Sequence, residues 1–306
     1  MRHLRLASRL ASRLASRLAS LLASLLAAAL VLPLADDGTV VRAEAAVPAA
    51  VAAPRIRAVS LPDRAGPPRA RGSWGGPAFD ACTAPPLDTL RAWRGASPYG
   101  AVGIYTSGSQ RGCAQPLLTA EWVRRARSMG WRFLPVHVGR QAPCADPSHK
   151  PGRIDPAKAV EQGREEAGEA AGALRSLGFA KGSPVYLDIE AYPLRDPLCG
   201  QAVVDFTLGW TAGLHAAGYR SGFYSSLDSG IADLAAAARA GGSPMPDALW
   251  YARWDGKADT DGSGGLAPDL WSFHQRVHQY HGNVEESFGG AALTVDHNHV
   301  DGPTAD

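Results

Sequence analysis

The sequence has few cysteines, only a small excess of positive charge and no hydrophobic run as long as a membrane span. An uncharged apolar run over residues 21–34 has 14 residues, whereas a membrane-spanning helix needs about 20. Lysine and arginine number 31 against 29 aspartates and glutamates among 306 residues, so no basic surface is indicated for nucleic-acid phosphates. We therefore expect neither a nucleic-acid partner nor a stable membrane span in the mature chain.

The first 45 residues have the order of features that is typical of a secretory signal peptide. Five arginines within residues 2–17 precede the apolar run, and Ala43-Glu44-Ala45 offers a cleavage site with small residues. No twin arginine precedes the run, which favours the general secretory route. An uncleaved anchor or an arginine-rich amphipathic leader is the alternative. Residues 1–45 contain 6 basic and 3 acidic residues, so the mature chain would have 25 against 26.

The remaining chain divides by composition into a linker and one domain. Residues 46–75 are rich in alanine, proline, arginine and glycine and predict a disordered linker. Residues 76–302 alternate short apolar segments with helical patterns, which predicts an α/β fold, a (β/α)8 TIM-like barrel. The segments after the sixth and seventh strands have little helical pattern, so we expect the barrel to be irregular at its seventh and eighth units. An open doubly wound sheet is the alternative fold.

The expected elements follow from hydrophobic pattern and from helix start and stop signals. Expected helices cover residues 87–94, 119–129, 155–177, 201–217 and 226–240. Expected strands end at residues 80, 105, 138, 190, 224, 252, 280 and 296.

The strand that ends at residue 190 carries two carboxylates two residues apart. Strand side chains alternate between faces, so Asp188 and Glu190 should point the same way, with Cα atoms roughly 6.5–7 Å apart. Carboxylates at the end of a buried strand are unfavourable unless they are paired, hydrated or used in chemistry. Glycoside cleavage uses two such groups, one as proton donor and one to stabilise positive charge or activate water. A pair that merely ends the strand and faces solvent or an arginine is the alternative.

Polar or aromatic residues also stand at the ends of the other expected strands. The carboxyl ends of barrel strands meet at one end of the barrel, so these side chains predict a pocket for a hydroxyl-rich ligand. The candidate binding residues are Asp80, Tyr105, His137, Tyr224, Trp254, Gln279, Tyr280, Asp296 and Asn298.

The sequence predicts no metal site and no cofactor. His297 and His299 alternate with Asp296 and Asn298, so the two histidines should lie on the opposite face of their strand. Acidic residues in the segment 255–262 lack the later glutamate of a calcium loop, and no Gly-x-Ser-x-Gly motif of a serine nucleophile is present.

Several short motifs resemble those of known glycoside hydrolase families. Residues 79–85 (FDACTAP) and 103–105 (GIY) resemble the glycoside-hydrolase-like domain-of-unknown-function family 1906. The chain is also similar to glycoside hydrolase family 25 lysozymes, and the resemblance covers roughly residues 76–302. The motifs that occur in the lysozyme order are FD (79–80), Tyr105, LDIE (187–190), WYARW (250–254), HQY (278–280) and VDHN (295–298).

The resemblance implies a bacterial protein, secreted or associated with the cell envelope, that acts on peptidoglycan or a related glycan. Glu190 would be the general acid, and Asp188 would stabilise the oxocarbenium-like centre or orient the substrate. Asp80 and Asp296 would add negative charge and contacts to hydroxyl groups. The alternative function is a non-catalytic glycan-binding barrel of the envelope. We expect the protein to be a monomer.

Four cysteines follow the first four expected strands, one after each. An even number of cysteines in a secreted chain predicts two disulfides, and their spacing does not resemble a zinc site. Neighbouring loops can approach within the Cα distance of a disulfide, whereas loops further apart usually cannot. This favours Cys82–Cys113 with Cys144–Cys199 over Cys113–Cys144 with Cys82–Cys199.

Overall fold

The computed structural model describes residues 72–305, except residues 147, 149 and 195. The expected signal peptide, residues 1–45, lies outside the described residues, as does the expected linker up to residue 71. The first strand begins at Ser73, so residues 73–75 belong to the folded domain rather than to the linker. The last strand ends at Pro303, one residue beyond the expected boundary.

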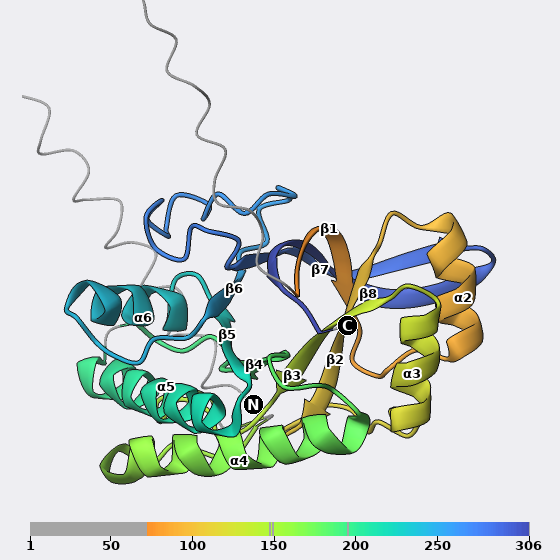
Figure 1. Ribbon diagram of the computed structural model, residues 1–306. Helices are drawn as coiled ribbons and strands as arrows, with labels where there is room; N and C mark the ends of the chain where they lie inside the picture. Colours follow the sequence, from red (N-terminus) through yellow and green to blue (C-terminus); the bar gives the residue numbers. More distant parts are fainter. Residues whose placement is uncertain (1–71, 147, 149, 195, 306) are drawn as a thin grey trace, which may run out of the picture. The chain divides into compact units, whose positions relative to one another are not determined.

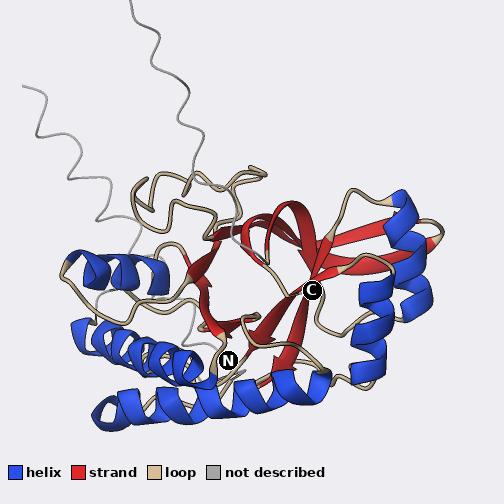
Figure 2. Cartoon of the chain, viewed as in Figure 1, coloured by secondary structure: helices blue, strands red, loops and turns tan. Residues whose placement is uncertain are grey.

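Eight strands form a closed barrel in which each strand pairs with its neighbours in sequence (Figures 1 and 2). The expected α/β barrel is confirmed, and the alternative of an open doubly wound sheet is wrong. The strands are β1 (Ser73–Asp80), β2 (Ala101–Ser107), β3 (Arg132–His137), β4 (Pro184–Asp188), β5 (Arg220–Ser226), β6 (Ala248–Ala252), β7 (Arg276–Phe288) and β8 (Ala291–Pro303).

Helices lie outside the strands and begin at capping residues. The side chain of Thr119 accepts a hydrogen bond from the Trp122 amide, and that of Asp196 accepts from two amides in the next helix. Because Asp196 and Pro197 together start a helix, α5 begins four residues before the expected position. The helices are α2 (Leu87–Ala96), α3 (Ala120–Ser128), η2 (Pro156–Lys158), α4 (Ala159–Leu177), α5 (Pro197–Ala217) and α6 (Gly230–Arg239).

The seventh and eighth units form a hairpin instead of two strand–helix units. Strands β1 to β7 run parallel, but β8 is antiparallel to both of its neighbours, β7 and β1. Gly289 and Gly290 join β7 to β8 with φ angles of 58° and 81°, a left-handed turn that glycine adopts without strain. The expected irregularity is confirmed, and its cause is this hairpin, which extends beyond the barrel beside α2 (Figure 1).

A long loop, residues 253–275, replaces the helix between β6 and β7 (Figure 2). The buried guanidinium of Arg276 donates hydrogen bonds to the carbonyl oxygens of Thr260, Ala267 and Leu270. One side chain therefore satisfies several carbonyl groups that a helix would have paired internally, and it holds the loop against the barrel.

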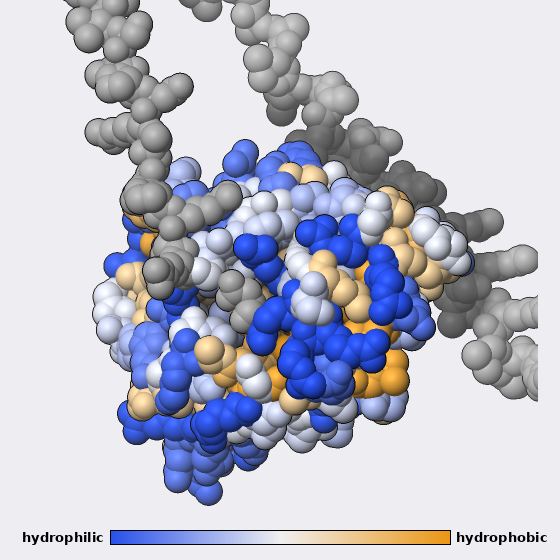
Figure 3. All heavy atoms as spheres, turned by 45° about the vertical axis from the view of Figure 1, so that its right-hand side comes forward, coloured by the Kyte–Doolittle hydropathy of each residue, from blue (hydrophilic) through white to orange (hydrophobic). Residues whose placement is uncertain are grey.

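The core has two layers because strand side chains alternate in direction. Inside the barrel, Leu134, Tyr186 and Trp250 fill the interior. Between strands and helices, Phe133 and Trp210 belong to a larger cluster. Seen from the side of α2 and α3, the surface is mostly hydrophilic, with smaller apolar areas among hydrophilic residues (Figure 3). No helix within the described part of the chain is long and apolar enough to span a membrane.

Helices α4 and α5 approach closely because glycines lie at their contact. A Cβ atom at Gly163 would lie 2.1 Å from the Phe206 carbonyl oxygen, and one at Gly209 would lie 2.1 Å from that of Val160. Gly168 lies on the exposed side of α4, where an added Cβ atom would have no neighbouring atom within 4 Å.

We predict opposite effects for alanine at two positions of α4. Gly168→Ala should raise the free energy of unfolding by about 0.5–1 kcal/mol, because alanine is the better helix former and meets no neighbour. Gly163→Ala should lower it by about 1–3 kcal/mol, because the methyl group forces the two helices apart. Urea unfolding of both variants measures this, and equal effects would contradict the close packing of α4 on α5.

Candidate active site

A pocket of about 300 Å³ opens at the carboxyl end of the barrel strands. Four carboxyl groups line it together with four other side chains that can form hydrogen bonds or ion pairs. Its charged and polar lining residues are Asp80, Asp188, Glu190, Asp296, Lys150, Tyr105, Asn283 and Thr294. The structure therefore brings together carboxyl groups that come from three different strands, β1, β4 and β8.

Asp80, the last residue of β1, is 2% exposed and accepts three hydrogen bonds. Its Oδ1 accepts from the Tyr105 hydroxyl at 2.9 Å, and its Oδ2 accepts from Asn298 at 2.8 Å and Gln279 at 3.1 Å. Burial, with a smaller contribution from the Asp296 charge, raises the pKa of Asp80 to about 7, although the three donors oppose this shift.

Asp188, the last residue of β4, is 4% exposed and has far fewer partners. Its Oδ1 is buried without a hydrogen-bond partner in the described structure, and its Oδ2 lies 3.8 Å from the Lys150 ammonium. Burial raises the pKa of Asp188 to about 7, the charges of Glu190 and Asp80 add to this, and Lys150 opposes it. The carboxyl group therefore changes its charge near neutral pH.

Glu190 lies two residues beyond Asp188, at the rim of the pocket. Its side chain is 48% exposed, and its carboxylate forms an ion pair with the Lys150 ammonium. Its backbone amide donates to the side-chain oxygen of Gln141 at 2.8 Å. Glu190 is thus the carboxylate of the pair that a bound molecule can reach most directly.

Asp296 stands directly opposite Asp80 in the register of β8 and β1. Its Oδ1 accepts from the Asn283 amide at 2.7 Å, and its Oδ2 lies 3.3 Å from the Gln279 amide nitrogen. Burial raises the pKa of Asp296. Asp296 is in the middle of β8 rather than at a strand end, and it reaches the pocket because β8 runs in the opposite direction to the other strands.

Two side-chain amides connect these carboxyl groups to aromatic donors. Trp250 donates from Nε1 to Asn298 Oδ1 at 2.8 Å, which turns the Asn298 nitrogen towards Asp80. The Tyr224 hydroxyl and the Trp254 Nε1 donate to Gln279 Oε1 at 3.0 and 3.2 Å, which turns its nitrogen towards the carboxylates. The ring of Trp254 is 56% exposed beside this network.

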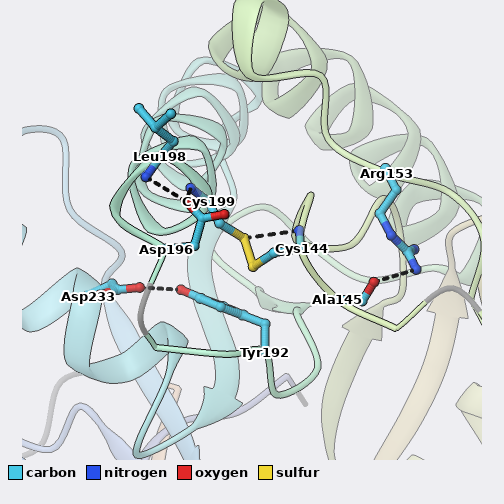
Figure 4. Close-up of a disulfide and its surroundings, with 8 residues drawn as sticks. All are labelled: Cys144, Ala145, Arg153, Tyr192, Asp196, Leu198, Cys199 and Asp233. Atoms are coloured by element: carbon cyan, nitrogen blue, oxygen red, sulfur yellow. Dashed lines mark hydrogen bonds between the residues drawn. A yellow bond between two sulfur atoms is a disulfide. The ribbon is translucent and has the colours of Figure 1, made fainter.

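Two disulfides tie the loops that follow the first four strands. Cys82–Cys113 and Cys144–Cys199 have Cα distances of 5.7 and 5.9 Å. This is the pairing that the sequence favours, and Cys82 itself lines the pocket. Around the second bridge, Cys144 donates its amide hydrogen to the Cys199 sulfur, and Tyr192 donates to Asp233 (Figure 4).

A model of the Rv2525c-like, glycoside hydrolase-like domain matches residues 91–300. The chain belongs to this family. The match confirms the resemblance to glycoside hydrolase barrels. No curated protein matches the chain.

Several solved structures are similar to this Rv2525c-like domain. An uncharacterized B. stearothermophilus protein is 20% identical with a TM-score of 0.51, over 74% of this chain and 96% of that chain. The catalytic domain of endolysin ply40 from bacteriophage P40 of Listeria monocytogenes is 15% identical, with a TM-score of 0.44 and coverages of 74% and 93%. The Clostridium perfringens spore cortex lytic enzyme SleM is 18% identical, with a TM-score of 0.48 and coverages of 76% and 68%.

Of the nine expected binding residues, Asp80, Tyr105 and Asp296 line the pocket of this Rv2525c-like domain. Tyr224, Trp254, Gln279 and Asn298 are not among its lining residues, and His137 and Tyr280 face away from it. His137 is fully buried between the barrel and the helices, 2.8 Å from Ser107 Oγ and 3.1 Å from Glu166 Oε2. Its neighbour Val136 faces the barrel interior, so alternation turns His137 outwards. Tyr280 likewise alternates with Gln279, and its ring packs on those of His278 and His297. Both assignments to the pocket are wrong.

Two residues that contact the carboxylate pair were not expected from the sequence. Lys150 and Gln141 both lie in the long loop between β3 and η2, and they contact the Asp188–Glu190 segment from outside its strand. In the sequence, only the length of this loop and its cysteine indicate that it could lie against the site. Within the described residues, no group of three or more His, Cys, Asp or Glu side chains is arranged to hold a metal ion.

We predict that Asp188 makes the Rv2525c-like domain less stable as the pH rises. Between pH 4 and 7 the unfolded chain has lost the Asp188 proton, whereas the folded domain retains it, because the pKa is raised from 3.8 to about 7. Asp188→Asn should therefore match the wild type near pH 4 and exceed its stability by about 1–3 kcal/mol at pH 8.

Urea unfolding at pH 4, 6 and 8 measures this difference. Asp205→Asn, a substitution on α5 away from the pocket, is the control and should keep the wild-type pH profile. Some pH dependence should remain in Asp188→Asn, because the pKa of Asp80 is also raised to about 7. An unchanged profile in Asp188→Asn would contradict the assignment.

Proposed function

We propose that the domain hydrolyses glycosidic bonds of peptidoglycan or a related cell-envelope glycan, with Glu190 as general acid. The observation that carries the proposal is the arrangement of Asp188 and Glu190, which open into one pocket from the end of one strand. Burial raises the pKa of Asp188 to about 7, so Asp188 holds a proton near neutral pH, and the proposal requires this proton to pass to Glu190 before cleavage. Membership in the glycoside hydrolase-like family supports the same chemistry.

The two carboxyl groups differ in the way that acid-catalysed cleavage requires. Glu190 is half exposed, so its carboxyl group can reach a glycosidic oxygen and protonate it as the bond breaks. Asp188 is buried, so once its proton has passed to Glu190 its negative charge can stabilise positive charge on the sugar ring. The low exposure of Asp188 makes its charge more effective there than it would be in water.

Lys150 must leave Glu190 before this reaction can occur. In the structure, its ammonium is paired with the carboxylate that would donate the proton. A carboxylate engaged in this way is not a proton donor, so we propose that the bound glycan displaces the ammonium or gives it another partner. The aliphatic stem of a lysine permits such a movement at low energetic cost.

The remaining pocket residues would bind the sugar. Asp80, Asp296 and Tyr105 present hydrogen-bonding groups at the cavity, and the buried amides of Asn298 and Gln279 hold the two aspartates from behind. The exposed ring of Trp254 would stack on the C–H face of a neighbouring sugar unit. The two disulfides support our proposal that the protein is exported and works outside the cytoplasm or in the cell envelope.

A glycan-binding barrel without turnover is the second candidate function. The ion pair between Lys150 and Glu190 favours it, because it neutralises the proposed acid in the absence of ligand. In such a protein, the carboxylates and amides of the pocket would serve only to hold hydroxyl groups.

We predict that Glu190→Gln abolishes hydrolysis without weakening binding. The amide occupies the same volume but cannot donate a proton to the leaving group, so the release of reducing ends from purified peptidoglycan should fall by about 10²–10⁴-fold. Glu169→Gln, on the exposed side of α4, is the matched control and should retain full activity. Glycan binding by the wild type without release of reducing ends would instead support the binding function.

We also predict that the hydrolysis rate falls as the pH rises through about 7. Asp188 loses its proton in this range, because burial raises its pKa to about 7, and the proposed transfer of that proton to Glu190 then has no source. Initial rates at saturating glycan between pH 4 and 9 measure the profile. A rate that stays constant over this interval would argue against proton donation by the pair.

A further inference from the structure

The side chain of Gln141 occupies the place of a missing strand residue beside the carboxylate pair. Strands β3 and β4 pair only as far as His137 and Leu187. Beyond this point the backbone of residues 188–190 has a neighbour on the β5 side, where the Ile189 amide donates to the Tyr224 carbonyl. On the β3 side, the chain has already turned away into the loop.

We propose that Gln141 is a positioning residue that fixes the backbone between Asp188 and Glu190 and thereby sets the position of the Glu190 carboxyl group. The proposal rests on the proposed function for its consequence in catalysis. Gln141 Nε2 donates to the Asp188 carbonyl oxygen at 2.9 Å, and Gln141 Oε1 accepts from the Glu190 amide at 2.8 Å. A residue of a parallel strand makes the same two bonds to residues that flank its partner.

Gln141 can act in this way because its own position is fixed. The residue is 1% exposed, and its backbone amide donates to the Gly152 carbonyl oxygen at 3.0 Å. Its carbonyl oxygen accepts from the Ile154 amide at 3.0 Å. The side-chain nitrogen also donates to the Gly139 carbonyl oxygen at 3.1 Å, which sets the plane of the amide group. The backbone on both arms of the loop is therefore joined at Gln141.

The residue before Gln141 is anchored to α4 by a partly buried ionic network. Both the backbone amide and the guanidinium of Arg140 donate to the carboxylate of Glu166 on α4. Glu166 is 4% exposed and also lies 3.1 Å from Nε2 of His137. A buried network with all members paired holds its geometry tightly, so His137 supports the site from behind the barrel although it does not line the pocket.

The disulfide Cys144–Cys199 fixes the same loop on its other side. It joins the loop to the first turn of α5, and Arg153 donates to the Ala145 carbonyl oxygen close by (Figure 4). The loop therefore has covalent and ionic attachments on both sides of Gln141. Through the Gln141 amide, these attachments act on the segment that carries both carboxylates.

Gln141→Leu, in the full mature chain, tests the proposal by a structural and a kinetic readout. Leucine fills the site but leaves the Glu190 amide and the Asp188 carbonyl without partners. Hydrogen exchange of the Glu190 amide, followed by NMR, should become at least about tenfold faster. The kcat for release of reducing ends should fall by about 10–100-fold while KM changes less than about threefold, because a misplaced acid affects the transition state more than binding.

Gln141→Glu provides conservative rescue, and it also covers the case in which the leucine variant does not fold. Its carboxylate can still accept from the Glu190 amide, but it can donate to the Asp188 carbonyl only when it is protonated. Its activity relative to the wild type should therefore recover as the pH falls. A residue with a merely structural role would not show this dependence on pH.

Gln275→Leu is the matched control for the loss of a glutamine amide. Gln275 donates to the Asp247 carbonyl oxygen at 2.7 Å, next to the start of β7 at the opposite end of the barrel. This variant should leave both kcat and the exchange rate of the Glu190 amide unchanged.

The possible outcomes separate the inference from the proposed function. Unchanged exchange at Glu190 in Gln141→Leu overturns the inference, whatever the activity is. Faster exchange with an unchanged kcat would mean that Gln141 fixes the backbone but does not set the position of the Glu190 carboxyl group for catalysis, which overturns that part of the proposal. If the wild type has no turnover, the proposed function fails, and the exchange rate alone decides whether Gln141 fixes this backbone.

Discussion

The need to keep several carboxyl groups close together in a buried pocket is the constraint on which the structure depends. Burial disfavours the charged form of each group, and the neighbouring charges add to this effect. Each carboxyl group is stabilised by a different set of partners. Asp80 receives three hydrogen bonds, Asp296 receives a backbone amide, and Glu190 is paired with Lys150 at the rim. Asp188 has only a distant ammonium and an oxygen without a partner, so its proton is its main compensation near neutral pH.

The hairpin of β7 and β8 makes this arrangement possible. In a regular barrel, eight parallel strands contribute residues to the pocket only from their carboxyl ends. Here β8 enters from the pocket side, so residues in its interior face β1 along a continuous register. Asp296 is opposite Asp80, and Asn298 donates to the same carboxyl group. The hairpin thereby brings both a second acidic residue and the donor that stabilises Asp80 to one place.

Most of the fold and part of the site could be predicted from the sequence, because those features depend on local patterns. The alternation of short apolar segments with capped helices predicted the eight strands, and the order of the loops predicted the disulfide pairing. The convergence of Asp188 and Glu190 was expected from alternation in one strand, and it holds although β4 ends at Asp188, two residues before Glu190. The direction of β8 was not predicted, because a strand pattern is the same in both directions. His137 and Tyr280 were misplaced because a strand end near the pocket does not decide which face a residue takes. Lys150 and Gln141 were missed because their partners are distant in sequence.

The unpaired oxygen of Asp188 bears on the choice between the two functions. A buried carboxyl group with one unsatisfied oxygen destabilises the folded domain, and such groups persist where their chemistry is needed. Binding of hydroxyl groups alone could be achieved by the amides and the paired carboxylates that surround it. A proton held near neutral pH beside a half-exposed glutamate is what acid catalysis requires in addition. In the proposed mechanism, Lys150 decides between the two functions: the pocket would only bind glycan while the ammonium remains on Glu190, and Glu190 could act as an acid once a ligand displaces it.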